Sequence, residues 1–222
     1  MTPQHRIQFV LLDSFDPLDV IGPYEVLEAG GKFAPGAIGL ELVSAEGPRL
    51  VPSGVRGLDL RATAVLDPTA DVIVVPGVVG PIEPPPDDPD AATIPVLLAR
   101  TGDTPLAGLL ATAVADPDVV VAGQCGGSLV LAMAGLIEGR HAVTHRLGMD
   151  LLDATGAIAV PARVVDDGDL ISAGGVTSGL DLGLHLLDRL VGPRIAHAVE
   201  ELFEYERRGI VWRAQGPVPV AV

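Results

Sequence analysis

The chain has 222 residues, of which 48% are hydrophobic, so it can bury one sizeable core and its length does not require two domains. Its formal net charge of −15 repels phosphate backbones, and no nucleic-acid partner is expected, although solubility alone would also explain this acidity. No stretch approaches the ~20 uninterrupted apolar residues of a membrane-spanning helix. Residues 1–13 also lack the basic region and cleavage site of a signal peptide. These features predict a cytoplasmic protein with no membrane partner.

The first half of the chain alternates buried-strand patterns with helical ones. Residues 7–12 form a continuous apolar run, which predicts the strand that opens a sheet. Residues 19–29 have helical spacing, and because proline is tolerated mainly in a first turn, Pro23 places the start of this helix near Gly22. The segment 81–89 is rich in proline and is expected to form a semi-rigid surface loop, or else a lid over a site. The remaining expected elements here are strands over 40–45 and 71–76 and helices over 94–100 and 105–115.

The second half continues this alternation. The expected elements are a strand over 119–122, a helix over 128–135, a short strand over 142–144 and a helix over about 148–154. Residues 163–173 are typical of a hairpin because Asp167-Gly168 separates two strand-like runs. Residues 178–206 predict one or two helices broken at Gly192-Pro193, and residues 215–222 an untethered tail. The whole pattern predicts a single α/β domain over 1–222, with its core at about 7–206 and a doubly wound sheet sandwiched by helices.

The only cysteine, Cys125, stands between Gly123 and Gly127, directly after a buried-strand pattern. This small-x-nucleophile-x-small spacing is typical of a nucleophile elbow, in which flanking glycines let the chain turn sharply from strand to helix. At a helix N-terminus, free N–H groups and the helix dipole would favour a reactive thiolate. The alternative is a buried, inert thiol, which would not need glycine on both sides of a turn. One cysteine cannot form an internal disulfide.

The chain contains four motifs in chain order: residues 19–26 (DVIGPYEV), 125–131 (CGGSLVL) with 134–136 (AGL), 144–145 (TH) and 174–181 (GGVTSGLD). Together they resemble the motifs of the ThiJ/PfpI superfamily. This superfamily consists of flavodoxin-like proteins that include the Parkinsonism-associated protein, bacterial intracellular proteases and isonitrile hydratases. They are most similar to the isonitrile hydratase branch, and the resemblance covers about residues 7–206. It implies a flavodoxin-like fold and a homodimer. Related regulator domains share these motifs but carry a DNA-binding helix-turn-helix after about residue 200, for which this chain is expected to be too short.

The resemblance gives Cys125 the role of nucleophile and makes Asp19 the acidic residue that lies against its sulfur. A carboxyl group beside a thiol can hold and pass one proton if burial raises its pKa. The residues alone leave another interpretation open, because an aspartate ahead of Gly22-Pro23 is also an ordinary helix N-cap.

The pocket around Cys125 is expected to include Gly126, Gly77, His145 and Thr177. Backbone N–H groups of Gly126 and Gly77 would support developing negative charge. His145 would shape or polarise the pocket, although a lone histidine after a short strand is also commonly structural. Thr177 belongs to the glycine-rich run 174–179, which would let the backbone approach the sulfur, with Thr177 or its neighbour capping the next helix.

Cofactors and metals are not expected. The run 174–179 lacks the Gly-x-Gly-x-x-Gly order of a dinucleotide site, and no Gly-Lys-Ser/Thr phosphate loop occurs. The five histidines show no metal-ligand spacing with the cysteine or with a carboxylate cluster.

The resulting hypothesis is a cofactor-independent enzyme that acts on a small molecule and adds water to an isonitrile, giving an N-substituted formamide through a thioimidate on Cys125. Two alternatives keep the same cysteine. One is a glutathione-independent glyoxalase-type enzyme acting on small carbonyls, and the other is a non-enzymatic redox sensor. Three departures from the hydratase pattern leave the substrate open: Gly126 replaces a threonine, Arg146 follows His145 in place of tryptophan, and Val78 follows Gly77 in place of glycine.

Overall fold

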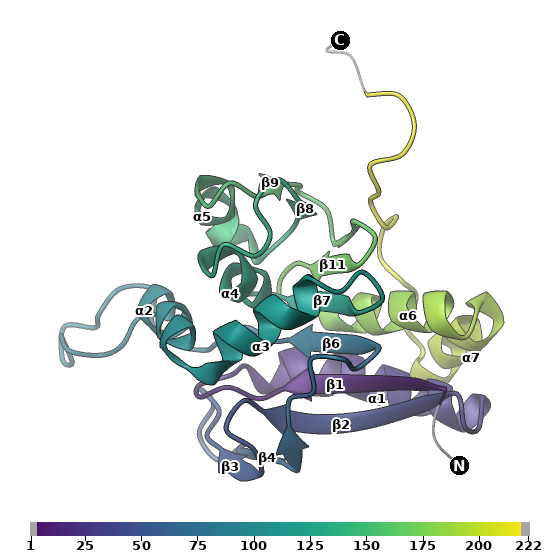
Figure 1. The fold of residues 1–222 in the computed structure, drawn as a ribbon, viewed down its shortest axis with the longest axis horizontal. Helices are drawn as coiled ribbons and strands as arrows, with labels where there is room; N and C mark the ends of the chain where they lie inside the picture. Colours follow the sequence, from purple (N-terminus) through teal and green to yellow (C-terminus); the bar gives the residue numbers. More distant parts are fainter. Residues whose placement is uncertain (1–3, 219–222) are drawn as a thin grey trace.

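The structure, a computed structural model, describes residues 4–218 and is built around a seven-stranded sheet in the order β10-β11-β7-β6-β1-β2-β5 (Figure 1). Neighbouring strands run parallel except β10 and β11, which form the predicted antiparallel hairpin. The strands are β1 (His5–Val10), β2 (Ile38–Ser44), β5 (Ala64–Val65), β6 (Val72–Val75), β7 (Val120–Gln124), β10 (Val164–Asp166) and β11 (Leu170–Ala173). Two small pairs lie outside this sheet: β3 (Arg49–Val51) with β4 (Leu60–Ala62), and β8 (His141–Ala142) with β9 (Ile158–Ala159).

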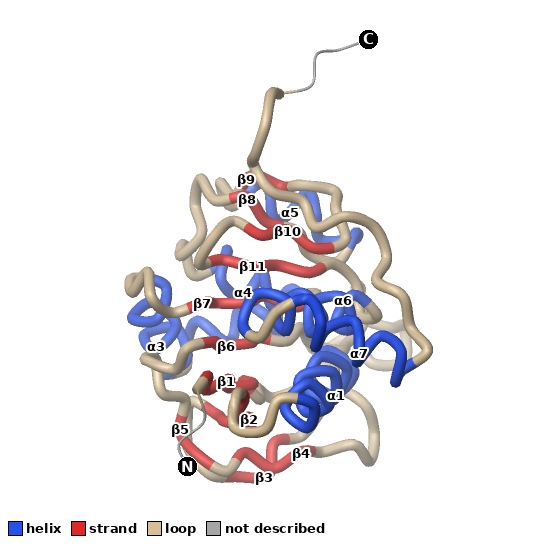
Figure 2. Tube along the Cα trace, turned by 90° about the vertical axis from the view of Figure 1, so that its right-hand side faces the viewer, coloured by secondary structure: helices blue, strands red, loops and turns tan. Residues whose placement is uncertain are grey.

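Helices cover both faces of the sheet (Figure 2). One face carries α1 (Pro17–Phe33), α6 (Ser178–Leu190) and α7 (Pro193–Phe203), and the other carries α3 (Pro105–Val114) and α4 (Gly127–Met133). Near α4 lie α2 (Ile94–Arg100) and α5 (Met149–Ala154). The 3-10 turn η1 (Thr101–Asp103) follows α2, and the 3-10 turn η2 (Arg146–Gly148) precedes α5. The predicted doubly wound α/β sheet sandwiched by helices is confirmed.

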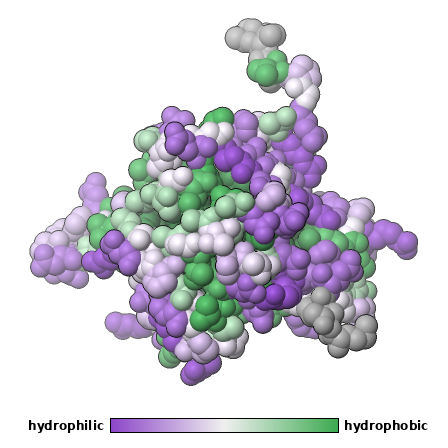
Figure 3. Space-filling model, viewed as in Figure 1, coloured by the Kyte–Doolittle hydropathy of each residue, from purple (hydrophilic) through white to green (hydrophobic). Residues whose placement is uncertain are grey.

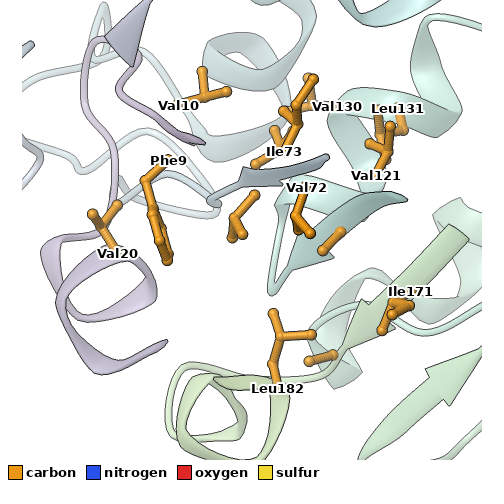
Figure 4. Close-up of a cluster of buried hydrophobic side chains, with 14 of the residues drawn as sticks. Phe9, Val10, Val20, Val72, Ile73, Val121, Val130, Leu131, Ile171 and Leu182 are labelled. Atoms are coloured by element: carbon orange, nitrogen blue, oxygen red, sulfur yellow. The ribbon is translucent and has the colours of Figure 1, made fainter. Parts of the chain in front are cut away.

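The core consists of aliphatic side chains packed between these layers. Figure 4 shows Val130 of α4 and Leu182 of α6 on opposite sides of the strands that carry Ile73 and Val121. All four side chains are buried, and burying each one stabilises the fold by about 1.5–3 kcal/mol. The sheet is therefore held from both sides, and the loops at its carboxyl ends start from fixed positions.

The start of α1 differs from the sequence-based expectation. The helix begins at Pro17, where the Asp16 carboxylate caps it by accepting a hydrogen bond from the Leu18 backbone N–H at 3.0 Å. Pro23 consequently lies inside the helix. The partner helix α6 makes room for its ring, since a Cβ on Gly179 would lie 2.9 Å from Pro23 Cδ. The prediction that Pro23 lies in the first turn of the helix was wrong, because packing against α6 accommodates the proline ring and the local sequence pattern does not show that packing.

The chain remains attached to the sheet well beyond α7. The Trp212 N–H donates to the Val164 carbonyl and its own carbonyl accepts from the Asp166 N–H, both at 2.9 Å. Of the predicted tail at 215–222, residues 219–222 lie outside the described residues. On the face shown in Figure 3, apolar residues gather near the centre and hydrophilic residues surround them. Over residues 4–218, no helix has the length and apolar character needed to span a bilayer.

Candidate active site

Three adjacent parallel strands and the first turn of α1 converge on Cys125. The cysteine follows β7, Gly77 follows β6 and Val176 follows β11. Because the carboxyl ends of parallel strands meet at one edge of a sheet, these loops lie together there. Cys125 adopts a left-handed conformation with φ +54°, which is uncommon for a residue with a side chain and concentrates at functional sites. Two hydrogen bonds fix this turn: the Cys125 N–H donates to Ala173 O at 3.0 Å, and Thr144 Oγ1 donates to Cys125 O at 2.7 Å.

Glycines allow the segments around the cysteine to approach one another closely. A Cβ on Gly127, the first residue of α4, would collide with the Val75 carbonyl oxygen at the end of β6. A Cβ on Gly77 would lie 2.6 Å from the Gly126 nitrogen and 3.0 Å from Asp19 Oδ2. Side chains at these positions would therefore push the cysteine turn away from Asp19.

Asp19 is fully buried and points toward the cysteine. Its Oδ2 accepts a hydrogen bond from the Gly77 N–H at 3.0 Å and its Oδ1 accepts one from Gln124 Nε2 at 3.3 Å, and the neighbouring Cys125 thiol also lowers the pKa of the carboxyl group. Burial, with a smaller contribution from the charge of Asp16, raises the pKa of Asp19 to about 8 despite these three groups. Asp16, not Asp19, caps the helix, so the N-cap interpretation of Asp19 does not apply.

The Cys125 thiol is stabilised in its protonated form. Burial, and then the negative charge of Asp19, raise its pKa above the ordinary value. The backbone N–H groups of Gly126 and Val176 lower the pKa of the thiol by favouring negative charge on the sulfur, but their effect is smaller than that of burial. The sequence-based expectation of a site that favours a thiolate is therefore wrong for the resting protein. The short α4 cannot compensate for the loss of solvent around the sulfur.

A cavity of about 280 Å³ opens onto Cys125. One wall comes from the β6–α2 connection and α2, and the other from η2 and α5. The lining residues are Asp16, Val78, Val79, Gly80, Ile82, Ile94, Pro95, Leu98, Cys125, Gly126, Leu129, His145, Leu147, Gly148, Leu151 and Val176. Of the proline-rich segment 81–89, only Ile82 contributes, so this segment forms part of a wall.

His145 both lines the cavity and holds a turn. Its Nδ1 accepts a hydrogen bond from the Leu147 N–H at 3.3 Å, which caps η2. Its ring lies against the loop after β11, where a Cβ on Gly175 would approach His145 Cδ2 to 3.0 Å. The two interpretations of His145, pocket residue and structural residue, are thus compatible with its position.

Two of the expected pocket residues serve other purposes in the structure. The Gly77 N–H donates to Asp19, so it is not free to stabilise charge on a substrate. Thr177 is exposed, does not line the cavity, and its side chain does not cap the helix that follows. Its hydroxyl and carbonyl oxygens accept hydrogen bonds from Arg163 Nη2 at 3.3 Å and 2.9 Å. Arg163 therefore holds Thr177, and the residue of this turn that acts on the sulfur is Val176, through its backbone N–H.

Sequence reasoning missed Gln124, which directly precedes the cysteine. Its side chain is fully buried, and its Nε2 donates to Asp19 Oδ1 and, at 3.2 Å, to the Val176 carbonyl. Its Oε1 is buried with no hydrogen-bond partner among residues 4–218. Gln124 therefore connects the carboxyl group to the loop that supplies a donor to the sulfur. A polar residue at the end of an otherwise apolar strand was the available signal.

Among the described residues, no group of three or more His, Cys, Asp or Glu side chains is arranged to hold a metal ion.

An α/β fold with a lone cysteine and a buried acid at its strand ends defines a class of cysteine-containing flavodoxin-like domains, and comparison identifies the family. Residues 97–189 match the model of the DJ-1/PfpI family. An isonitrile hydratase of Pseudomonas putida is 34% identical over 204 residues, which cover 90% of this chain and 78% of the hydratase. The chain belongs to the DJ-1/PfpI family, and the predicted membership of the ThiJ/PfpI superfamily is confirmed.

Two further relatives extend this comparison. The crystal structure of a THiJ/PfpI family protein from Pseudomonas syringae superposes with a TM-score of 0.75 at 26% identity, covering 94% of this chain and 78% of that protein. The HTH-type transcriptional regulator CdhR of Pseudomonas aeruginosa is 26% identical over 200 residues. That match covers 88% of this chain but only 53% of the regulator. The family therefore includes both an enzyme and a regulator among the relatives of this chain.

Proposed function

We propose that this protein is an enzyme that hydrates isonitriles to N-substituted formamides. The observation that carries the proposal is the buried Asp19 beside the Cys125 thiol at the end of a mainly apolar cavity. Similarity to the Pseudomonas putida isonitrile hydratase over most of both chains supports the choice of substrate. Asp19 does not resemble a group that simply stabilises the fold, since burying a carboxyl group with a raised pKa costs stability.

The first step adds the thiol across the terminal carbon of the isonitrile. Asp19 takes the proton of Cys125, the sulfur forms a bond to the terminal carbon, and Asp19 returns that proton to the same carbon. The product is a thioimidate, R–N=CH–S–Cys125, and Asp19 is again a carboxylate. A carboxyl group with a pKa of about 8 suits this role, because it can both hold and release a proton near neutral pH.

The second step hydrolyses the thioimidate. Asp19 takes a proton from water as the hydroxide adds to the imidate carbon, and it passes this proton to the substrate nitrogen. The adduct then loses the sulfur as the C–S bond breaks, and the hydroxyl proton moves through Asp19 to Cys125. The formamide R–NH–CHO leaves, and one water has been consumed. The N–H groups of Gly126 and Val176 stabilise the sulfur whenever it carries negative charge.

The test is turnover of p-nitrophenyl isonitrile, followed by absorbance and by detection of the formamide. Wild type is expected to turn over, whereas Cys125→Ala is expected to show no activity above background, because no other thiol exists in the chain. Full activity in Cys125→Ala would exclude the mechanism. If wild type formed lactate from methylglyoxal instead, the glyoxalase-type alternative would replace the hydratase.

The redox-sensor alternative is less well supported. Oxidation-sensing cysteines are accessible and have a low pKa, whereas burial raises the pKa of the Cys125 thiol. The homodimer expected from the family resemblance stays a prediction, which light scattering of the purified protein would check.

Gln124→Leu is expected to shift the pH dependence of hydration. The Gln124 hydrogen bond lowers the pKa of Asp19, so its loss should move the pH at which kcat/KM is half-maximal upward by about one unit. Gln8→Leu is the matched control, because Gln8 is an equally buried glutamine of the same sheet that is hydrogen-bonded to Glu41 and Asp67 away from the site. An unchanged pH profile in Gln124→Leu would show that Gln124 does not position the acid.

A further inference from the structure

The cavity beyond Cys125 is walled by aliphatic side chains from two separate segments. Val78, Ile82, Ile94 and Leu98 come from the β6–α2 connection and from α2, and they face Leu147 and Leu151 of η2 and α5. Leu98 is buried, whereas Leu147 and Ile82 are 62% and 60% exposed and lie toward solvent. A bound molecule would therefore pass exposed leucine and isoleucine side chains and enter an interior lined mainly by aliphatic side chains.

The charges around this cavity are negative. Among its described lining residues there is no lysine or arginine, and the carboxylate of Asp16 is present. The charge of Asp16 reaches the reacting groups, because it contributes to raising the pKa of both Asp19 and Cys125. A carboxylate carried into this space would lose hydration, meet no lysine or arginine side chain among the described lining residues and be repelled by Asp16.

The volume limits the size of the occupant. Sites for drug-sized ligands span roughly 300–1,000 Å³. At about 280 Å³ this cavity lies just below that range. It suits a reactive group at the sulfur plus one ring or one branched alkyl group.

We propose that this site selects isonitriles whose nitrogen substituent is an uncharged apolar group of about one ring, and that it discriminates against isonitriles bearing a carboxylate. This inference rests on the proposed function and specifies its substrate class. The terminal carbon lies at the sulfur, the substituent packs between Leu98 and Leu147, and Asp16 provides the electrostatic discrimination.

The turnover test compares cyclohexyl isonitrile with isocyanoacetate. Wild type is expected to prefer the neutral substrate by at least about 100-fold in kcat/KM, the size of effect that desolvating an unpaired charge produces. Asp16→Asn keeps a good helix N-cap but removes the charge, so the preference should fall several-fold. Leu147→Arg supplies a cation at the mouth and should lower the preference by about tenfold. The preference is a ratio of the kcat/KM values for the two substrates, so any effect of these changes on Asp19 and Cys125 that is common to both substrates cancels.

Ile158→Arg is the matched control for Leu147→Arg. Ile158 is 45% exposed on β9 and does not line the cavity, so this variant gains the same charge elsewhere on the surface. Its substrate preference is expected to equal that of wild type. A preference that falls equally in Ile158→Arg and Leu147→Arg would overturn the assignment of selectivity to the cavity.

A second readout does not depend on turnover. Because Cys125 is the only cysteine, whole-protein mass reports alkylation at this one sulfur. The rate of alkylation of the folded protein is measured with iodoacetamide, which is neutral, and with iodoacetate, which is anionic. Each rate is divided by the rate of the same reagent with the urea-unfolded chain. The normalised rate should be at least about tenfold higher for iodoacetamide, and Asp16→Asn should reduce this difference. Equal normalised rates would overturn the inference. A neutral preference in alkylation without hydration of either isonitrile would support the apolar, anion-rejecting site and exclude the proposed function.

Discussion

Asp19→Asn is expected to lower kcat/KM for isonitrile hydration by about 10²–10⁴-fold, the usual contribution of a positioned general acid and base. Asparagine has the same shape as aspartate, but it can neither accept the Cys125 proton nor deliver one. The matched control is Asp13→Asn, since the Asp13 side chain is 66% exposed, pairs with Arg49 and does not line the cavity. Near-wild-type activity in Asp19→Asn would remove Asp19 from the mechanism.

The pH dependence of the wild type tests the same assignment. The reactive state has one proton shared between Asp19 and Cys125, and it forms when the fully protonated pair loses a proton. With a pKa of about 8 for Asp19, kcat/KM should rise about tenfold per pH unit below this value and level off above it. The rise should disappear from the residual activity of Asp19→Asn. A flat wild-type profile between pH 6 and pH 9 would contradict the assignment.

Stability should change in the opposite direction to activity. The pKa of Asp19 is about 8 in the folded protein against 3.8 for an ordinary aspartate, so the folded state holds this proton more tightly. As pH rises from about 4 to 8, the unfolded state gains stability by ionising, and the wild type loses stability. The loss between pH 5 and pH 8 is on the order of 4 kcal/mol.

Urea unfolding at pH 5 and pH 8 measures this effect in wild type and Asp19→Asn. The free energy of unfolding of the variant relative to wild type should increase with pH, because asparagine does not titrate. A constant cost of fitting an amide between the Gly77 and Gln124 donors cancels in that comparison. A pH-independent difference would show that Asp19 has an ordinary pKa.

Local pattern predicted most of the fold because the strands and helices carry their own signals. The helix over 94–100 has the predicted bounds, and the break at Gly192-Pro193 separates α6 from α7 as expected. The strands β3, β4, β5 and β9 were missed because two or three residues are too few to show a period. The start of α1 was misplaced because the space for Pro23 comes from Gly179, more than 150 residues away in the sequence.

The site was only partly predictable for the same physical reason. The glycines around Cys125 identify a sharp turn, and the structure places a left-handed cysteine there. The protonation of the thiol, however, depends on burial and on Asp19, which arrives from α1. The direction of Thr177 and the hydrogen bonds of Gln124 also depend on how the loop after β11 lies against β7. Residue type and spacing do not contain these contacts, although the polar Gln124 at the end of an apolar strand was a partial signal.

Asp166→Ala is expected to destabilise the fold by about 2–4 kcal/mol. The Asp166 carboxylate is buried and accepts hydrogen bonds from His185 at 2.9 Å, Arg189 at 3.1 Å and Arg213 at 2.9 Å. These donors come from α6 and from the segment after α7, so Asp166 joins both to β10. Removing it leaves two guanidinium groups without their carboxylate, although partial exposure of both arginines limits the cost.

Chemical unfolding and Trp212 fluorescence measure the two consequences of this change. Trp212 is the only tryptophan, and its backbone pairs with β10 beside Asp166, so release of this segment should shift its emission to the red before global unfolding. Asp188→Ala removes a more exposed carboxylate that pairs with Arg207, and it should cost less than about 1 kcal/mol. Equal effects of the two variants on stability and fluorescence would contradict the role of Asp166.

The effect of Asp166→Ala should also depend on pH in a defined direction. Its hydrogen bonds from His185, Gly168 and Arg213 outweigh burial and hold the pKa of Asp166 well below its usual range. A depressed carboxyl pKa gives stability that is fully present above about pH 4, the ordinary aspartate value, and is lost as pH falls toward the folded-state pKa. The difference in unfolding free energy between wild type and Asp166→Ala should therefore shrink below pH 4. The contribution of Asp19 to stability falls as pH rises from about 4 to 8, whereas the contribution of Asp166 falls as pH drops below about 4. The two carboxyl groups together predict that wild-type stability is greatest near pH 4.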